Sequence, residues 1–123
     1  MNSSVFVAVA LSMIAVSSAA YAGGDPAAGK SVFNKCAVCH SPAAGKNNVG
    51  PTLFGIVGRH SATVPGYSYS DAMKAANKTW DEATLGAYLA NPQAMVPGTK
   101  MTFPGLPKPE DRANVIAYLA TLK

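Results

Sequence analysis

The feature of this sequence that most constrains its fold is the pentapeptide Cys36-Ala37-Val38-Cys39-His40, which contains both cysteines of the chain. On a helical stretch, residues at i, i+3 and i+4 share one face, so the two thiols and the imidazole point the same way. This pattern is typical of covalent haem attachment, in which both sulfurs form thioethers with the porphyrin and the histidine binds the iron. A chain that binds a rigid, planar haem through three side chains has to fold around that haem.

Three other interpretations of the two cysteines are open at this point. A disulfide would close a very short loop and remove little chain entropy. Structural zinc normally takes a full set of Cys and His ligands, and beyond His40 the chain offers only His60. A redox-active dithiol of the thioredoxin kind needs a βαβ context, which the sequence does not indicate. Haem attachment is therefore the favoured hypothesis.

The first residues have the pattern of an export signal. Residues 5–16 are an apolar run, and Ala20-Tyr21-Ala22 provides an A-x-A cleavage site. The run is shorter than the roughly 20 residues that span a bilayer. We expect residues 1–22 to be a cleaved signal peptide and residues 23–123 to be one haem domain in the bacterial periplasm, because haem attachment needs reduced cysteines outside the cytoplasm.

Helical patterns occur at both ends of this domain and between them. Asp25-Pro26 supplies an N-cap followed by proline at the first helical position. Residues 70–76 predict a short helix, and Thr79-Trp80-Asp81-Glu82 fits a capping box for a helix that stops at Asn91-Pro92. Pro109-Glu110-Asp111 opens the last helix, with acidic residues in its first turn.

Two long segments, residues 41–69 and 92–107, are predicted to be loops. They are rich in Gly, Pro, Ser, Thr and Asn, and no stretch of the chain alternates as a strand does. Loops this long in a small domain usually serve a function. Apolar residues within them indicate loops wrapped around a large buried group; they are Leu53, Phe54, Ile56, Val57, Met95, Val96, Met101, Phe103 and Leu106. The predicted class is all-α.

The charge of the chain points to protein partners rather than nucleic acid. The formal net charge is +4, and the ten basic residues are scattered singly. No Lys or Arg run of the kind that binds nucleic acid is present. A moderately basic surface is suited to steering acidic protein partners.

Several motifs in order give the sequence a family resemblance. These are KCAVCH (35–40), GPTLFGIVGR (50–59), PGYSYSDAMK (65–74), NKTW (77–80), NPQAMVPGTKMTFPGL (91–106) and IAYL (116–119). Together they closely resemble class I cytochrome c, as in a bacterial relative of mitochondrial cytochrome c. The resemblance runs from about Gly24 to Leu122 and implies the class I fold: about three main helices, short helices, and long loops wrapped around one covalent haem c.

The residues alone leave the second axial ligand open. Candidates are Met73, Met95, Met101 and His60, of which Met95 and Met101 lie in the proline-rich loop. In the family the ligand follows PGTK, so the resemblance implies Met101, with His40 on the other face. Met95 then fills an apolar gap, and His60 is expected at the surface.

The resemblance also implies the surroundings of the haem. It suggests that His40 donates to the backbone carbonyl of Pro51, that Tyr88 lies near the Met sulfur and that Thr99 closes the loop. It places Arg59, Tyr69 and Trp80 near the propionates. Met73 departs from the family, whose members often carry Asn there, and the loop between His40 and Pro51 is one residue shorter than in the mitochondrial proteins. Gly29 and Phe33 are expected to pack against Val115 and Tyr118.

These features predict a soluble one-electron carrier with one covalent haem c and no catalytic activity. His/Met ligation raises the reduction potential and leaves no open coordination position. Lys35, Lys100 and Lys108 are expected to guide docking onto acidic surfaces of redox proteins, such as a cytochrome bc1-type complex, an oxidase or a photosynthetic reaction centre. A monomer with at most peripheral membrane contact is expected. The alternative is a haem c enzyme or sensor with a labile distal ligand, such as a weak peroxidase or a gas binder.

Overall fold

The computed structural model describes residues 23–123; the expected signal peptide over residues 1–22 lies outside the described residues. Among residues 23–123 no strand is present, and the pairing of β type is a single isolated bridge between His60 and Thr79. The all-α prediction is therefore confirmed. The helices are α1 (Pro26–Phe33), α2 (Asp71–Ala76), α3 (Glu82–Ala90), α4 (Pro92–Met95) and α5 (Pro109–Leu119).

The predicted starts of α1, α2 and α5 are confirmed. The side chain of Asp25 accepts from the backbone N–H of Ala27, and Pro26 follows at the first helical position. The side chain of Ser70 accepts from the N–H of Met73 and so caps α2. At α5, Glu110 and Asp111 occupy the first turn, where negative charge is favourable beside the helix dipole.

The start of α3 differs from the expected capping box. Asp81, not Thr79, is the N-cap, and its carboxylate accepts from the N–H of Thr84 over 2.7 Å. Thr79 instead pairs with His60 in the isolated bridge. The N–H of Trp80 donates to the carbonyl of Arg59, and its carbonyl accepts from the N–H of Gly58. Residue 80 is therefore held outside the helix, and Asp81, the next suitable residue, caps it.

Helix α4 lies inside a segment that was predicted to be loop throughout. Asn91 ends α3, as expected, but its side chain also accepts from the N–H of Ala94 and starts α4 at once. The proline that cannot continue α3 is thus the first residue of the next helix, because Pro is well suited to that position. A helix of one turn has too few residues for a periodic pattern to reveal it.

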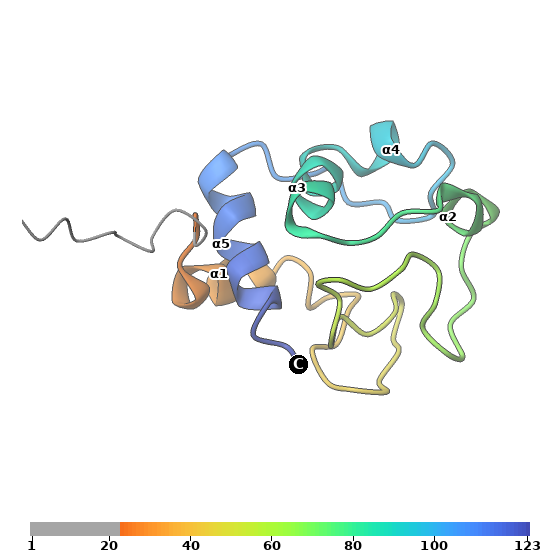
Figure 1. Cartoon of the computed structure of the whole chain (residues 1–123), viewed down its shortest axis with the longest axis horizontal. Helices are drawn as coiled ribbons and strands as arrows, with labels where there is room; N and C mark the ends of the chain where they lie inside the picture. Colours follow the sequence, from red (N-terminus) through yellow and green to blue (C-terminus); the bar gives the residue numbers. More distant parts are fainter. Residues whose placement is uncertain (1–22) are drawn as a thin grey trace, which may run out of the picture.

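The two terminal helices cross at one end of the molecule, and α3 packs against both α5 and α4 (Figure 1). Gly29 lies at the crossing: a side chain there would overlap the backbone carbonyl of Asn114. Phe33 and Tyr118 stack with ring centroids 5.1 Å apart. The expected close packing of Gly29 and Phe33 on the last helix is confirmed.

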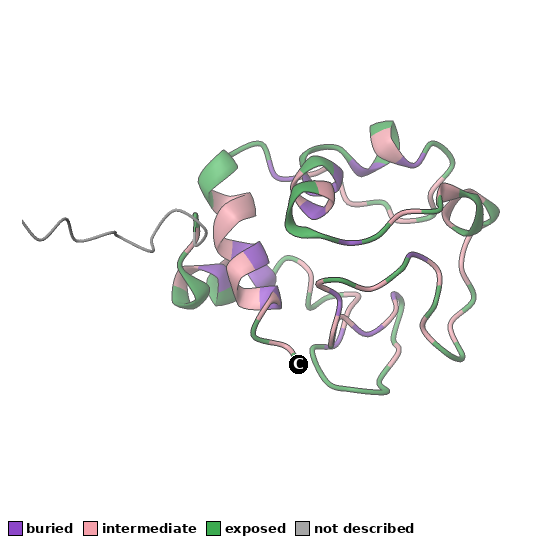
Figure 2. Ribbon diagram, viewed as in Figure 1, coloured by how far each residue is buried: buried purple, intermediate pink, exposed green. Residues whose placement is uncertain are grey.

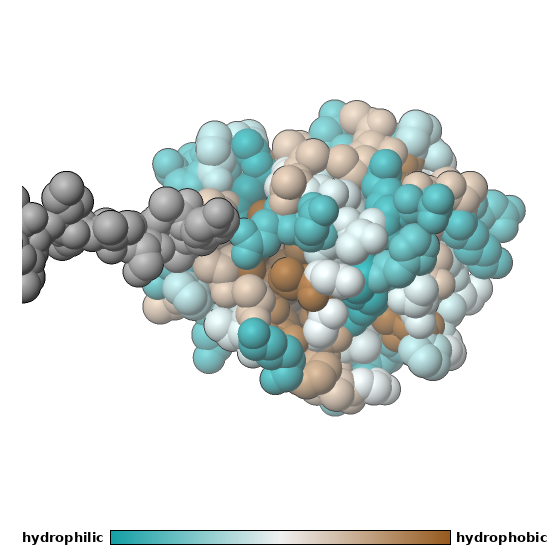
Figure 3. Space-filling view, in the orientation of Figure 1, coloured by the Kyte–Doolittle hydropathy of each residue, from teal (hydrophilic) through white to brown (hydrophobic). Residues whose placement is uncertain are grey.

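Buried residues line the inner sides of α3 and α5 and continue into the loops between them (Figure 2). From outside, apolar surface shows between polar side chains near the middle of one face (Figure 3). Over residues 23–123, no helix combines the length and apolar character needed to cross a membrane.

Candidate functional site

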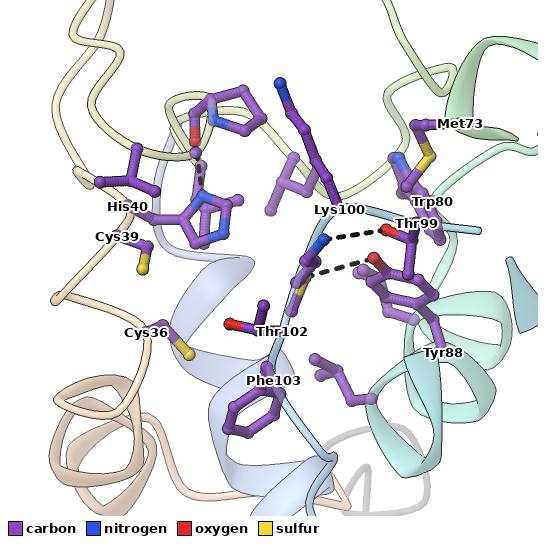
Figure 4. A pocket seen from close by; sticks show the side chains of 18 of the residues that line it. Cys36, Cys39, His40, Met73, Trp80, Tyr88, Thr99, Lys100, Thr102 and Phe103 are labelled. Carbon is purple, nitrogen blue, oxygen red and sulfur yellow. Dashed lines mark hydrogen bonds between the residues drawn. The ribbon is translucent and has the colours of Figure 1, made fainter. Parts of the chain in front are cut away.

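A cavity of about 680 Å³ opens between the helices and the two long loops. Cys36, Cys39 and His40 lie along one side of it, and Trp80 and Tyr88 lie across from them (Figure 4). Among residues 23–123, eleven hydrophobic residues form the buried core, and seven of these line the cavity. Most of the buried hydrophobic side chains therefore face this cavity.

The two cysteines are positioned by a helical turn that continues beyond the end of α1. The N–H of Cys36 donates to the carbonyl of Phe33 over 2.8 Å, and the N–H of His40 donates to the carbonyl of Cys36 over 2.9 Å. Both thiols are free. Burial raises the pKa of the Cys36 thiol, and nearby Cys39 adds to this while Lys35 opposes it. A redox-active dithiol needs the opposite shift, toward a reactive thiolate.

The imidazole of His40 is held in one orientation. Its Nδ1 lies 2.7 Å from the backbone oxygen of Pro51, and because a carbonyl can only accept, Nδ1 carries the proton and Nε2 keeps a free lone pair. Burial lowers the pKa of His40 and outweighs the opposing effect of the Pro51 hydrogen bond, with Arg59 lowering it further. Gly50 lies so close to the ring that a Cβ there would come within 2.6 Å of Nδ1. A neutral, fixed imidazole is suited to bind a metal.

All polar atoms of Met101 have partners. Its N–H donates to Oγ1 of Thr99 over 3.3 Å, and the hydroxyl of Tyr88 donates to its sulfur over 3.2 Å. Its carbonyl accepts from Nε2 of Gln93 over 2.8 Å. Burial raises the pKa of Tyr88, although its hydrogen bond with the Thr99 side chain lowers it, so the phenol remains a donor. The thioether is thus fixed at the cavity.

Gln93 is a contact of this site that sequence reasoning did not find. It lies on α4, in the segment predicted to be loop, and neither its type nor its spacing marks it. No local signal marks its role, because its partner Met101 lies eight residues further along the chain.

The residues expected near the propionates all line the cavity. The guanidinium of Arg59 donates to the carbonyl of Thr52 over 3.0 Å and also to that of Phe54. The hydroxyl of Tyr69 accepts from the N–H of Val64 over 3.1 Å. The indole of Trp80 packs against Tyr88, with ring centroids 4.9 Å apart.

The other candidates for axial ligand are placed differently. Met73 lines the cavity from α2 (Figure 4), whereas Met95 and His60 do not line it. Met95 packs against the core, which agrees with its expected role as a gap filler. His60 is exposed, as expected.

Two of the three lysines expected to guide docking lie at the cavity. Lys35 and Lys100 line it, and Lys108, the residue before α5, does not. The ammonium of Lys100 lies 4.7 Å from the ring centroid of Tyr67 and donates to the carbonyl of Ser68. The exposed valines Val38 and Val49 also line the cavity.

The residues at the cavity fit a covalently attached haem. Its volume is in the range of cofactor sites, and its walls are mainly apolar and aromatic. Two free thiols, a neutral imidazole and a methionine thioether are the donors that a c-type haem requires, and the thioether with a fixed position here is that of Met101. Over residues 23–123, no three His, Cys, Asp or Glu residues gather as a metal cluster, so the zinc alternative finds no set of ligands.

Comparisons with known proteins agree with this fit. A family model described as "Cytochrome c" matches residues 26–123. The chain is 56% identical to cytochrome c2 of Rhodomicrobium vannielii over 107 residues, which cover 85% of each protein. It is 54% identical to cytochrome c2 of Rhodoblastus acidophilus over 101 residues, which cover 81% of this chain and 94% of that one.

A solved structure gives the same result for the fold. The structure of cytochrome cH from Methylobacterium extorquens matches with a TM-score of 0.76 and 48% identity, over 80% of this chain and 99% of that one. The chain therefore belongs to the cytochrome c family: it is a class I c-type cytochrome related to mitochondrial cytochrome c, with an all-α fold and one covalently bound haem c.

Proposed function

We propose that the chain is a soluble periplasmic carrier of single electrons, with haem held by thioethers to Cys36 and Cys39 and with His40 and Met101 as axial ligands. The observation that carries this proposal is that the Met101 thioether, fixed through its backbone and its sulfur, shares one cavity with the Cys36–His40 pentapeptide. When bound, the haem supplies a one-electron couple.

In this function the protein would hold and orient the haem and exclude water from it. With haem bound, His40 and Met101 would be its two iron ligands from the protein, so that no coordination position would stay open to oxygen or peroxide. A thioether is a soft, neutral ligand that raises the reduction potential, and the apolar walls disfavour the more highly charged oxidised site. We therefore propose a carrier rather than an enzyme.

Replacing Met101 by Leu tests the ligation. The oxidised wild-type protein should show the Met-to-iron absorption band near neutral pH, and Met101→Leu should lose it while keeping its haem through denaturation. The reduced wild-type protein should not bind carbon monoxide readily, whereas the variant should. Rapid, stoichiometric carbon monoxide binding by the wild type would instead favour an enzyme or sensor with a labile distal ligand.

We propose that partners dock at the mouth of the cavity. Val38 and Val49 are 80% and 73% exposed there, and they flank the hydrogen bond of 2.8 Å from the N–H of Gly50 to the carbonyl of Cys39. Lys35 lies at the same cavity. An apolar centre with basic neighbours suits a redox protein whose docking surface is apolar and rimmed by carboxylates, such as a bc1-type complex, an oxidase or a photosynthetic reaction centre.

Electron-transfer rates with membranes of the source organism, measured across ionic strength, test this surface. Lys35→Glu should slow transfer at low salt and converge with the wild type at high salt, because screening removes a steering effect. Val38→Ser should slow transfer by a similar factor at every salt concentration. Lys35 is a cleaner test than Lys100, whose side chain also contacts Tyr67 and Ser68. Rates unaffected by Lys35→Glu at low salt would rule out this docking surface.

Export and oligomeric state have direct tests. The periplasmic fraction should contain a protein that begins at Gly23 and has the mass of residues 23–123 plus one haem. Light scattering should give the mass of a monomer. Protein retained in the membrane with residues 1–22 attached would contradict cleavage.

A further inference from the structure

The short helix α4 makes a contact to Met101 that the family resemblance does not suggest. Gln93, the second residue of α4, donates from Nε2 to the backbone carbonyl of Met101 over 2.8 Å. We propose that Gln93 is a positioning residue that holds Met101 at the cavity and so keeps its sulfur on the iron. This inference rests on Met101 being the iron ligand proposed above.

Gln93 projects from a fixed base, although its own side chain is exposed. The residue before it, Pro92, is among the most deeply buried of the protein, and Val96 at the other end of α4 is 1% exposed. Two hydrogen bonds close the turn between them. The side chain of Asn91 accepts from the N–H of Ala94, and the N–H of Val96 donates to the carbonyl of Pro92. The Gln93 amide therefore extends from a part of the chain that cannot move without opening the core.

The segment that carries Met101 has few backbone ties of its own. It is anchored before Met101 by the hydrogen bond from Thr99 N–H to the Val96 carbonyl, and after it by the hydrogen bond of 2.7 Å from Leu106 N–H to the Leu89 carbonyl. Residues 97–108 contain no helix.

The N–H of Met101 is bonded within this segment, to Thr99. The hydroxyl of Tyr88 donates to the sulfur of Met101 and not to its backbone. In the described chain, the hydrogen bond from Gln93 is thus the one that ties the backbone of Met101 to a helix.

Release of the sulfur requires the segment to move outward, and this movement has to break the Gln93 hydrogen bond. The contribution of one such hydrogen bond corresponds to roughly a two- to tenfold change in an equilibrium constant. We therefore expect that removing the donor makes the open form roughly two- to tenfold more populated and leaves haem attachment unchanged.

The test measures how readily imidazole displaces Met101 in the oxidised protein with haem attached. The Met-to-iron absorption band is titrated with imidazole in the wild type, in Gln93→Met, which has similar length but no donor, and in Gln93→Lys, which keeps a donor. Ala94→Met is the matched control, because Ala94 is exposed on the same helix and its side chain makes no hydrogen bond. Imidazole should bind Gln93→Met roughly two- to tenfold more tightly than the wild type, and Gln93→Lys and Ala94→Met close to the wild type.

Equal imidazole affinity in Gln93→Met and the wild type would overturn the role of Gln93. Equally tighter imidazole binding in Gln93→Met and Gln93→Lys would also overturn it, because the lost contacts of the glutamine side chain, and not the lost donor, would then explain the change in affinity. A wild-type protein without any Met-to-iron band would overturn the proposed ligation itself, which distinguishes failure of the function from failure of this inference.

Discussion

At the scale of single residues, the position of the His40 imidazole depends on a neighbour that has no side chain. Gly50 lies against the ring, and a Cβ built there would come within 2.6 Å of Nδ1 and 2.9 Å of Nε2. His40 can therefore reach the Pro51 carbonyl only because residue 50 is glycine. The Gly50-Pro51 pair thus has two roles: Gly50 leaves space for the ring, and the carbonyl of Pro51 accepts the hydrogen bond from its Nδ1–H.

We predict that Gly50→Ala displaces the imidazole and weakens its hydrogen bond to Pro51. Overpacking of this kind costs about 1–3 kcal/mol of unfolding free energy. Denaturant titration of the protein with haem attached should show this loss, and the NMR signals of the His40 ring should shift. Gly86→Ala is the control, since a Cβ at Gly86 would make only an ordinary contact of 3.8 Å with Ile116. Wild-type stability and unchanged His40 signals in Gly50→Ala would contradict the prediction.

How far the sequence predicts individual residues depends on whether their chemistry is local. The common direction of Cys36, Cys39 and His40 is predicted by their spacing, because one helical turn sets it, and the long loops and the family resemblance then favour haem attachment over the other interpretations. Tyr88 and Thr99 come from the family resemblance, and the structure places both against Met101. Gln93 could not be predicted, because its role depends on a one-turn helix and on the return of the chain eight residues later.

At the scale of helices, local sequence patterns find most elements but not always their first residue. Thr79 and Asp81 are both good N-caps, and their order in the sequence favours Thr79. The bridge between His60 and Thr79 decides against it. A contact between distant segments cannot be predicted from a few neighbouring residues. Local sequence therefore predicts α3 but not that Asp81 is its N-cap.

The cap of α3 should make stability depend on pH. The backbone and side chain of Thr84 donate to Asp81 and lower the pKa of its carboxyl, with a small opposing effect of burial. A lowered pKa in the folded state means that the stabilisation is present above the ordinary carboxyl pKa and is lost as the pH falls through the folded value. Asp81→Ala should therefore lower the melting temperature at pH 7, and its difference from the wild type should shrink below about pH 4.

Asp81→Asn separates charge from capping, because asparagine caps a helix about as well as aspartate. It should keep most of the melting temperature at neutral pH and respond less to acid than the wild type. Differential scanning calorimetry of the three proteins between about pH 3 and pH 7 checks both points. If Asp81→Ala lowered the melting temperature by the same amount at both ends of this range, the ionised form of the cap would not be what stabilises α3.

Two glycines within helices, Gly86 in α3 and Gly29 at the crossing of α1 and α5, should respond in opposite ways to substitution by alanine. Gly86→Ala should stabilise the protein by about 0.5–1 kcal/mol, because alanine loses less backbone entropy in a helix and the space is open. Gly29→Ala should destabilise it by about 1–3 kcal/mol, because the new methyl would overlap the Asn114 backbone and push the helices apart. Urea titrations compare the two variants, and an unchanged Gly29→Ala midpoint would show that the crossing tolerates a side chain.

At the scale of the whole molecule, the two long loops were the sign that the core is not built from protein alone. Residues Leu53, Ile56, Met101 and Phe103, taken from these loops, line the cavity. Val96 and Leu106 are instead buried in the core, at 1% exposure each. Sequence predicts that such residues lie inside, and for Phe54, which is 37% exposed and does not line the cavity, this prediction is wrong. Which of the others face the cavity depends on how the loops close, and that follows only from the full fold.

The stability of the folded chain should depend on the haem that the cavity encloses. Seven of the eleven buried hydrophobic residues within residues 23–123 line the cavity, among them Trp80, Leu85 and Val115. Without haem their inner faces would contact water, and a domain of this size has little stability to spare. We therefore expect the chain with Cys36→Ala and Cys39→Ala, produced without attached haem, to lose most of its helical circular dichroism and its cooperative unfolding transition.

Met101→Leu is the control for this comparison, because it removes an axial ligand and leaves both attachment sites. It should keep its haem, its helical signal and a cooperative transition at a lower midpoint. A native-like spectrum and a cooperative transition in the haem-free chain would contradict the prediction, because the helices would then be able to pack without the cofactor. If the prediction holds, the residues that line the cavity stabilise the fold only through the haem they enclose, so that attachment and folding are one event.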